Sequence, residues 1–153
     1  MNISEHITLK EATKSELAIR RNLQNTPNEQ QLENMRIVAN EVFEPLRKFF
    51  NVPIGISSFF RSVEVNKAIG GSSTSQHCTG EAIDIDADIY GNLKNIDIFM
   101  FIKNNLEFDQ LIWEFGNDFE PDWVHVSFSA KKNRKQILRA SKFNGKTVYS
   151  KAS

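Results

Sequence analysis

The stretch SQHCTGEAIDID, residues 75–86, constrains this chain more than any other part of the sequence. It starts in a polar loop that holds His77, one of only three histidines in the chain. Residues 82–86 then alternate between apolar and acidic side chains, which predicts a strand with isoleucines on one face and Asp84 on the other. A turn at Gly80 would bring His77 and Asp84 together.

A second histidine lies further along the chain, in the segment Asp122-Trp123-Val124-His125. His125 falls on a predicted strand over residues 123–129, whose alternate apolar residues would face the core. A catalytic zinc ion takes three protein ligands from His, Asp, Glu or Cys and leaves a fourth position for water. We therefore predict that His77, Asp84 and His125 hold one zinc ion.

Asp122 is the candidate general base for such a site. It lies three residues before His125, and an odd offset in a regular strand puts two side chains on opposite faces. The interpretation therefore requires Asp122 to lie before the regular strand, in the irregular backbone that follows Pro121. Glu114, in a predicted strand over residues 110–115, is a rival general base, and it can equally orient a ligand histidine or lie at the rim.

Simpler interpretations of the same residues stay open at this point. A single histidine on an apolar strand is more often structural than a metal ligand. Cys78 is a soft ligand type beside His77, but adjacent residues of an extended chain point apart, which favours a buried apolar role for it. A nucleophilic pair of Cys78 and His77 is a further alternative. His6, in the N-terminal segment, receives no role.

Composition narrows the class of protein. The chain has 153 residues, about the size of one domain, and its 19 basic and 19 acidic residues cancel, so we expect no general binding to nucleic acid. The basic tract over residues 131–135 is expected to be a solvated turn. One cysteine cannot form an intramolecular disulfide, and no apolar run approaches the roughly 18 residues of a membrane span. No signal-peptide pattern is visible, so we expect synthesis in the cytoplasm.

Helices are expected mainly in the first half and strands mainly in the second, which favours an α+β fold. The longest helix is expected to begin with Thr26 as its N-cap and Pro27 at its first position, and Pro45 should kink or restart it. Asn95 is expected to cap a later helix. Further helices are expected over residues 8–22 and 62–69, and strands over 54–58, 82–86, 110–115, 123–129 and 136–140, with a hairpin turn at residues 144–145.

Residues 75–84 read S-x-H-x-x-G-x-A-x-D, and the tetrapeptide D-W-V-H follows downstream. This combination closely resembles the zinc D-Ala-D-Ala carboxypeptidase family. That family also includes D-Ala-D-Ala dipeptidases and the L-alanyl-D-glutamate endopeptidases of phage lysins, and it shares its fold with the Hedgehog signalling domain. The resemblance covers about residues 8–128, and segments such as EPLRKFF and VNKAIGGSSTSQH resemble the phage and prophage wall hydrolases of the family.

The resemblance assigns roles by position. The matches to the zinc ligands are His77, Asp84 and His125. Asp122 matches the catalytic acid/base, and Arg61 matches an arginine that faces the substrate, with a surface salt bridge as its simpler alternative. Ser75 matches a serine that helps to hold the substrate or the loop, or it is only a turn residue. Phe59 stands where the family has a small glycine, which puts substrate preference in doubt more than metal binding.

The resemblance also implies the architecture and the substrate. We expect a single zinc peptidase domain over residues 1–153, with a core over about 8–129 and C-terminal strands over 136–149. N-terminal helices would pack on a small, mainly antiparallel sheet, with one zinc ion per chain. The implied substrate is a peptidoglycan stem peptide, cut by a carboxypeptidase or an endopeptidase; the alternative is an inactive zinc-containing binding domain. We expect a monomer without membrane insertion that reaches the wall after lysis, by holin-type release or in a phage particle.

Overall fold

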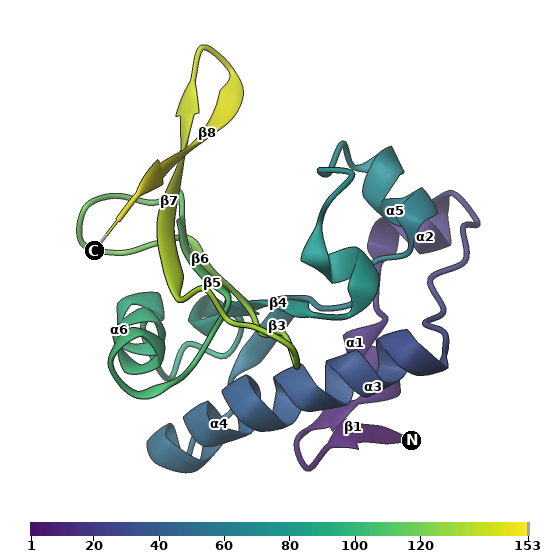
Figure 1. Cartoon of the computed structure of the whole chain (residues 1–153), viewed down its shortest axis with the longest axis horizontal. Coiled ribbons are helices and arrows are strands. Elements are labelled where there is room, and N and C mark those ends of the chain that lie inside the picture. Colours follow the sequence, from purple (N-terminus) through teal and green to yellow (C-terminus); the bar gives the residue numbers. More distant parts are fainter. Residues whose placement is uncertain (153) are drawn as a thin grey trace.

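The computed structural model describes residues 1–152 as an α+β fold around one sheet of six strands (Figure 1). No helix in this range is both long and apolar enough to span a bilayer. The helices are α1 (Leu9–Ala12), α2 (Glu16–Arg20), α3 (Glu29–Val38), α4 (Glu44–Phe50), α5 (Val63–Ala68) and α6 (Asn95–Asn105), with the turns η1 (Ala39–Phe43), η2 (Gln76–Thr79) and η3 (Ala87–Ile89). The strands are β1 (Asn2–Ser4), β2 (Ile7–Thr8), β3 (Gly55–Ser58), β4 (Ala82–Asp86), β5 (Gln110–Glu114), β6 (Trp123–Ser127), β7 (Gln136–Phe143) and β8 (Lys146–Lys151).

The strands of the main sheet lie in the order β3-β4-β6-β5-β7-β8. All neighbours are antiparallel except β5 and β7, which are parallel. After β6 the chain crosses to the far side of β5 and runs in the same direction as β5, so the sheet is mixed. β1 and β2 form a separate small hairpin.

Alternation along the central strands separates an apolar face of the sheet from a polar face. Ile83 and Ile85 of β4 and Val124 of β6 are fully buried in the main core cluster. That cluster also includes side chains of α3, α4 and α6, and burial of each large apolar side chain contributes roughly 1.5–3 kcal/mol. Asp84 and His125, which alternate with these residues, therefore lie on the opposite face of the sheet.

Several predicted boundaries are confirmed. The hydroxyl groups of Thr8, Ser15 and Ser62 each accept a backbone N–H from the first turn of a helix. Pro45 lies in the first turn of α4, directly after the π-helical turn η1, so the predicted restart is confirmed. Proline suits this position because its ring fixes φ and it has no N–H to donate. The predicted turn at residues 144–145 joins β7 to β8.

The predicted start of the longest helix at Thr26 and Pro27 is wrong. α3 begins after Asn28, which is its N-cap. The side-chain oxygen of Asn28 accepts the N–H of Gln31 at 2.8 Å, and the side-chain oxygen of Gln31 accepts the N–H of Asn28 at 2.8 Å. This reciprocal capping box satisfies two backbone N–H donors at once. The helix therefore begins after Asn28, and not after Thr26.

The prediction that Asn95 caps α6 is also wrong. The N-cap residue is Lys94, and Asn95 is the first helical residue, with a fully buried side chain. Its amide oxygen accepts the N–H of Ala87 at 2.8 Å, and its amide nitrogen donates to the carbonyl oxygen of Asp122 at 2.9 Å. Asn95 therefore joins two distant segments instead of closing the end of its own helix.

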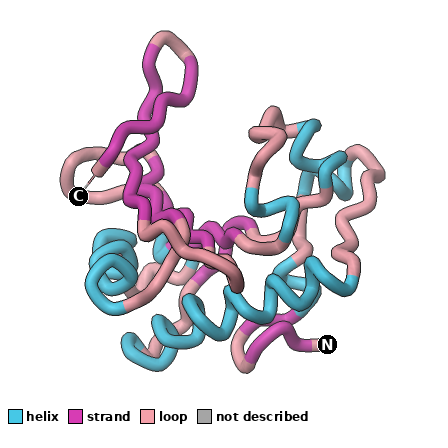
Figure 2. The backbone as a smooth tube through the Cα atoms, viewed as in Figure 1, coloured by secondary structure: helices cyan, strands magenta, loops and turns pink. Residues whose placement is uncertain are grey.

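The β7–β8 hairpin extends away from the helices, as the long magenta arm in Figure 2 shows. Its outer part, residues 141–151, is exposed throughout. This arm belongs to the same sheet as the central strands, so the polar face of the sheet continues onto it.

A substitution at Gly80 tests how closely η2 packs on α3. It ends η2 with a φ of +80°, and a Cβ atom there would lie 2.5 Å from the carbonyl oxygen of Gln31. Gly91 has a similar φ of +76° but nothing within 4 Å of the same point. We expect Gly80→Ala to lower the free energy of unfolding by roughly 2–4 kcal/mol, and Gly91→Ala by about 1 kcal/mol from backbone strain alone. Urea denaturation measures both values, and equal losses would contradict the close packing.

Candidate metal centre and active site

The short 3₁₀ turn η2 presents His77 to the polar face of the sheet. Ser75 is the N-cap of this turn, and its hydroxyl oxygen accepts the N–H of His77 at 3.3 Å. From α3, the side-chain amides of Gln31 and Asn34 donate to two carbonyl oxygens of η2 at 3.1 and 2.9 Å. The turn that carries the histidine is thus held by a well-packed helix.

His77, Asp84 and His125 meet at one point. The register of β4 and β6 pairs Asp84 with His125, whose Nδ1 lies 3.0 Å from Oδ1 of Asp84. Nε2 of His77 lies 3.3 Å from the same oxygen. One candidate ligand atom from each residue lies within 4.8 Å of the others, a spacing that a single ion can bridge. The structure therefore brings together the three residues predicted as ligands.

The hydrogen bonds of His77 fit a metal ligand. Its Nδ1 lies 2.7 Å from the carbonyl oxygen of Phe59, so Nδ1 carries the proton and donates it. Its Nε2 is buried and has no hydrogen-bond partner among residues 1–152. A lone pair on Nε2 then faces the Asp84 carboxylate, and a cation between these two acceptors would relieve their repulsion. Two imidazole nitrogens and one carboxylate oxygen are a ligand set that suits zinc.

Asp84 is held in its charged form. Burial acts to raise its pKa, but the neighbouring imidazoles of His77 and His125 hold the pKa well below the usual range. The side chain is therefore an ionised carboxylate at neutral pH, which is the form that binds a cation.

The cluster opens into a cavity of about 710 Å³. Its floor is the polar face of the sheet, one wall is the segment between α5 and η2, and the other wall is the β7–β8 hairpin. Besides the three candidate ligands, the lining includes Arg61, Ser75, Gln76, Glu114, Trp123, Arg134 and Tyr149.

Glu114 is a buried carboxyl group in this cavity, with 7% of its surface exposed. The register of β5 and β6 puts it on the same face of the sheet as His125. Burial raises the pKa of Glu114 to about 7; His125 and Arg61 lower this pKa, while Asp84 raises it. A carboxyl group that titrates near neutrality can both accept and release a proton during catalysis.

Arg61 enters the cavity from the segment between β3 and α5. Its backbone N–H donates to the carbonyl oxygen of His77 at 3.2 Å. Its side-chain Nε is buried without a hydrogen-bond partner, and the guanidinium forms no salt bridge within the described part of the chain. This fork of donors is therefore available to a carbonyl or carboxylate oxygen of a ligand.

A sequence model of the Peptidase M15 family matches residues 5–127. The chain belongs to the Peptidase M15 family. A search of curated proteins finds no match. Membership implies a peptidase, and M15 peptidases are zinc-dependent, so the cluster of His77, Asp84 and His125 is the candidate metal site of this one. The matched part ends before β7 and β8.

Asp122 lies outside the cavity of this M15 peptidase. It directly precedes β6 and is exposed, so it lies off the regular strand as the sequence interpretation requires. Its backbone N–H donates to the carbonyl oxygen of Glu114 at 2.9 Å. Its side chain does not line the cavity, whereas that of Glu114 does. The role of Asp122 as general base stays a prediction, and the geometry favours Glu114.

Phe59 does not narrow the cavity of the M15 peptidase. Its side chain is 1% exposed and lies in the main core, as does that of Phe60. Only the backbone carbonyl of Phe59 reaches the site, where it accepts the hydrogen bond from His77. The large residue at this position is therefore compatible with an open pocket.

Cys78 is partly exposed, whereas the sequence favoured a buried side chain. It does not line the cavity. Burial raises the pKa of its thiol, and the charge of Arg61 lowers it, with a net upward shift. A thiol that stays protonated at neutral pH is a poor nucleophile, so the structure does not support the Cys78–His77 alternative.

Sequence patterns did not reveal Asp109, a buried carboxylate that braces the residue next to His77. Gln76 donates to Asp109 at 2.9 Å, and Arg134 donates through Nε and a terminal nitrogen to both Asp109 oxygens at 2.8 and 2.9 Å. Hydrogen bonds from Arg134 lower the pKa of Asp109 to about 2, against the effect of burial. Arg134 thus anchors the basic tract over residues 131–135, which was expected to be only a solvated turn. Asp109 and Arg134 lie too far apart in sequence for a local pattern to reveal their pairing.

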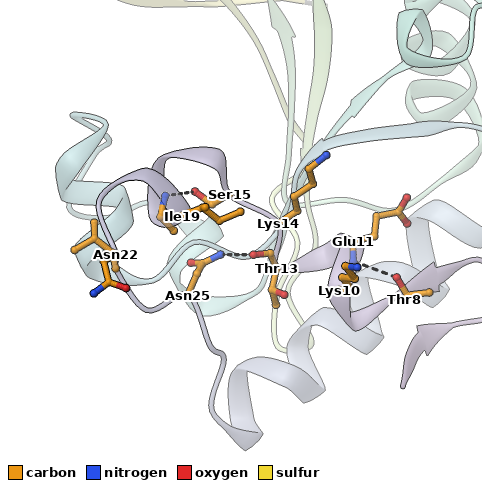
Figure 3. A pocket seen from close by; sticks show the side chains of 11 residues that line it. Thr8, Lys10, Glu11, Thr13, Lys14, Ser15, Ile19, Asn22 and Asn25 are labelled. Atoms are coloured by element: carbon orange, nitrogen blue, oxygen red, sulfur yellow. Dashed lines mark hydrogen bonds between the residues drawn. The ribbon is translucent and has the colours of Figure 1, made fainter.

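A second, larger hollow of about 880 Å³ lies beside α1 and α2, and Figure 3 shows it from close by. Its lining has neither histidine nor cysteine, and Glu11 is its single carboxylate. Burial raises the pKa of Glu11. This hollow therefore lacks a set of metal ligands, and the cavity beside His77, Asp84 and His125 is the candidate active site.

The third histidine, His6, lies in the turn of the N-terminal hairpin and contacts Glu44 at the start of α4. Its Nδ1 lies 2.6 Å from Oε1 of Glu44, and the hydroxyl of Ser4 donates to Oε2 of Glu44 at 2.6 Å. These bonds tie the turn between β1 and β2 to the start of α4. Glu5, His6 and Glu44 also lie close enough together to hold an ion, but Glu5 and His6 are exposed and Glu44 already has its protein partners.

The Asp109–Arg134 pair predicts a pH dependence of stability. The folded pKa of Asp109, about 2, lies below its unfolded value of about 3.9. The stability that it contributes is therefore fully present above about pH 4 and is lost as the pH falls through about 2. We expect Asp109→Asn to lower the free energy of unfolding by roughly 2–3 kcal/mol at pH 7.

Asp118→Asn is the matched control, because it removes the exposed ion pair between Asp118 and Arg139. We expect this change to cost less than about 1 kcal/mol. Urea denaturation at pH 7 and at about pH 2 measures both effects. The Asp109 variant should approach the wild type at the lower pH, and a pH-independent difference would contradict the assignment.

Proposed function

We propose that the protein is a zinc peptidase that hydrolyses amide bonds in the stem peptides of peptidoglycan. The observation that carries this proposal is a single cavity that holds three candidate metal ligands, a buried carboxyl group and an arginine whose Nε has no hydrogen-bond partner among residues 1–152. The resemblance of residues 75–84 to D-Ala-D-Ala carboxypeptidases and phage-lysin endopeptidases supports the choice of substrate. The bond cut is either the terminal D-Ala-D-Ala bond or an internal bond of the stem.

In this proposal His77, Asp84 and His125 hold the metal. Bound zinc would polarise the scissile carbonyl and lower the pKa of the attacking water to about 7. Glu114 would accept a proton from the attacking water and would return it to the leaving amine. Arg61 donates hydrogen bonds to an oxygen of the substrate, either the carbonyl oxygen as it gains negative charge or a peptide carboxylate.

Metal content tests the first part of this proposal. We expect the purified wild type to bind one zinc ion per chain. We expect His77→Ala and His125→Ala to weaken zinc binding more than the roughly 10–100-fold that loss of an outer hydrogen bond costs, because each removes a ligand. Elemental analysis and competition with a chelator measure these affinities. His6→Ala is the control, and loss of zinc in that variant would move the site to the N-terminal hairpin.

The general base is tested with two isosteric changes. We expect Glu114→Gln to keep zinc and to lower kcat by roughly 10²–10⁴-fold, since it removes the proton acceptor. We expect Asp122→Asn to stay within about threefold of the wild type, because its exposed side chain lies outside the cavity. The opposite pattern would restore Asp122 as the acid/base.

The substrate is tested by digestion with the zinc-loaded protein. Purified wall fragments and a pentapeptide that ends in D-Ala-D-Ala are incubated with it, and the products are weighed by mass spectrometry. Release of D-Ala identifies a carboxypeptidase, and internal cleavage of the stem identifies an endopeptidase. A protein with stoichiometric zinc that cuts neither substrate would instead be an inactive zinc-containing binding domain.

A further inference from the structure

The β7–β8 hairpin lies beyond the part of the chain that matches the family, yet it forms one wall of the cavity. Leu138 of β7 and Thr147 and Tyr149 of β8 line the cavity together with the candidate metal ligands. In Figure 1 the hairpin and the α5 segment rise at opposite ends of the sheet, and residues of the hairpin and of the segment between α5 and η2 line the cavity. A peptide bound at the three candidate metal ligands would therefore lie beside this hairpin.

The register of the sheet places Tyr149 in line with Glu114. Glu114 of β5 pairs with Ala140 of β7, and Ala140 pairs with Tyr149 of β8. Directly paired residues point to the same face of a sheet, so all three side chains lie on the polar face. Neighbouring strands are about 4.8 Å apart, which puts the backbone of Tyr149 roughly 10 Å from that of Glu114.

The residue between them is small. Ala140 is fully buried, while the other residues of β7 are partly or wholly exposed. A methyl group at this position leaves room for the long side chain of Tyr149 to lean over it toward Glu114. Tyr149 itself keeps 55% of its surface exposed, so part of the ring and its hydroxyl group can meet a ligand.

The electrostatic surroundings of Tyr149 agree with this placement. Burial raises the pKa of its phenol, the charges of Glu114 and Asp84 raise it further, and Arg61 lowers it. These three charged residues line the same cavity. The phenol is therefore protonated at neutral pH and can donate a hydrogen bond.

We propose that Tyr149 is a substrate-binding residue of this site, whose hydroxyl group donates a hydrogen bond to a backbone carbonyl oxygen of the bound peptide. Arg61 contacts the peptide from the opposite wall, so the substrate lies across Glu114 between two donors. The hairpin thus adds a contact that the family-matched part of the chain does not contain. This inference rests on the proposed peptidase function, because it assigns a contact to that substrate.

Tyr149→Phe tests the inference, because it removes only the hydroxyl group. Tyr90→Phe is the matched control: Tyr90 is 53% exposed and does not line the cavity. We expect Tyr149→Phe to lower kcat/KM on wall peptides by roughly three- to tenfold, the value of one neutral hydrogen bond. Zinc content and Tm should match those of the wild type, and Tyr90→Phe should leave all three quantities unchanged.

Binding gives a second readout that does not depend on turnover. We expect the Glu114→Gln variant to bind a wall peptide without cutting it, and adding Tyr149→Phe to that background should raise the Kd for the same peptide by roughly three- to tenfold. An active wild type whose Tyr149→Phe variant has the same kcat/KM and Kd would overturn this inference and leave the proposed function intact. A wild type that neither cuts nor binds wall peptides would overturn both.

Discussion

The pairing of β4 with β6 is the interaction on which the site depends. It sets Asp84 opposite His125, while Ile83 and Val126 meet on the buried face of the same two strands. Because side chains alternate along a strand, a shift of one strand by one residue in this register would turn one of the two candidate ligands into the core and separate it from the other. The burial that stabilises the fold therefore also fixes the positions of Asp84 and His125 relative to each other.

The third candidate ligand is positioned by a different means. His77 does not lie on a strand, and its turn is held by amides of α3, by the carbonyl oxygen of Phe59 and, through Gln76, by the buried Asp109. Each of these contacts comes from a packed segment far away in the sequence. A ligand set held in this way keeps its spacing before a metal binds, so little conformational entropy is lost on binding.

The sequence predicted what depends on local patterns. Alternation identified β4, hydroxyl residues identified three helix starts, and residue type together with family resemblance brought His77, Asp84 and His125 into one hypothesis. The errors came from long-range contacts. Asn95 was predicted to cap α6 because the sequence does not show that its side chain bonds to Ala87 and Asp122.

The choice between the two candidate bases shows the same limit. The spacing of Asp122 to His125 is a local fact, whereas the position of Glu114 depends on the register between β5 and β6. The register is set by packing of whole strands, which one sequence does not reveal. The parallel pairing of β7 with β5, which brings the hairpin to the cavity, depends on the same kind of information.

The position of β8 at the end of the strand order has one more consequence. An edge strand offers unpaired backbone groups to any other extended chain, which is a common route to aggregation. In β8 the exposed Lys146 and Lys151 stand at the two ends of the strand, and the exposed Lys142 lies on its neighbour. If two copies approached edge to edge, these like charges would repel one another, which disfavours pairing of β8 with a second copy.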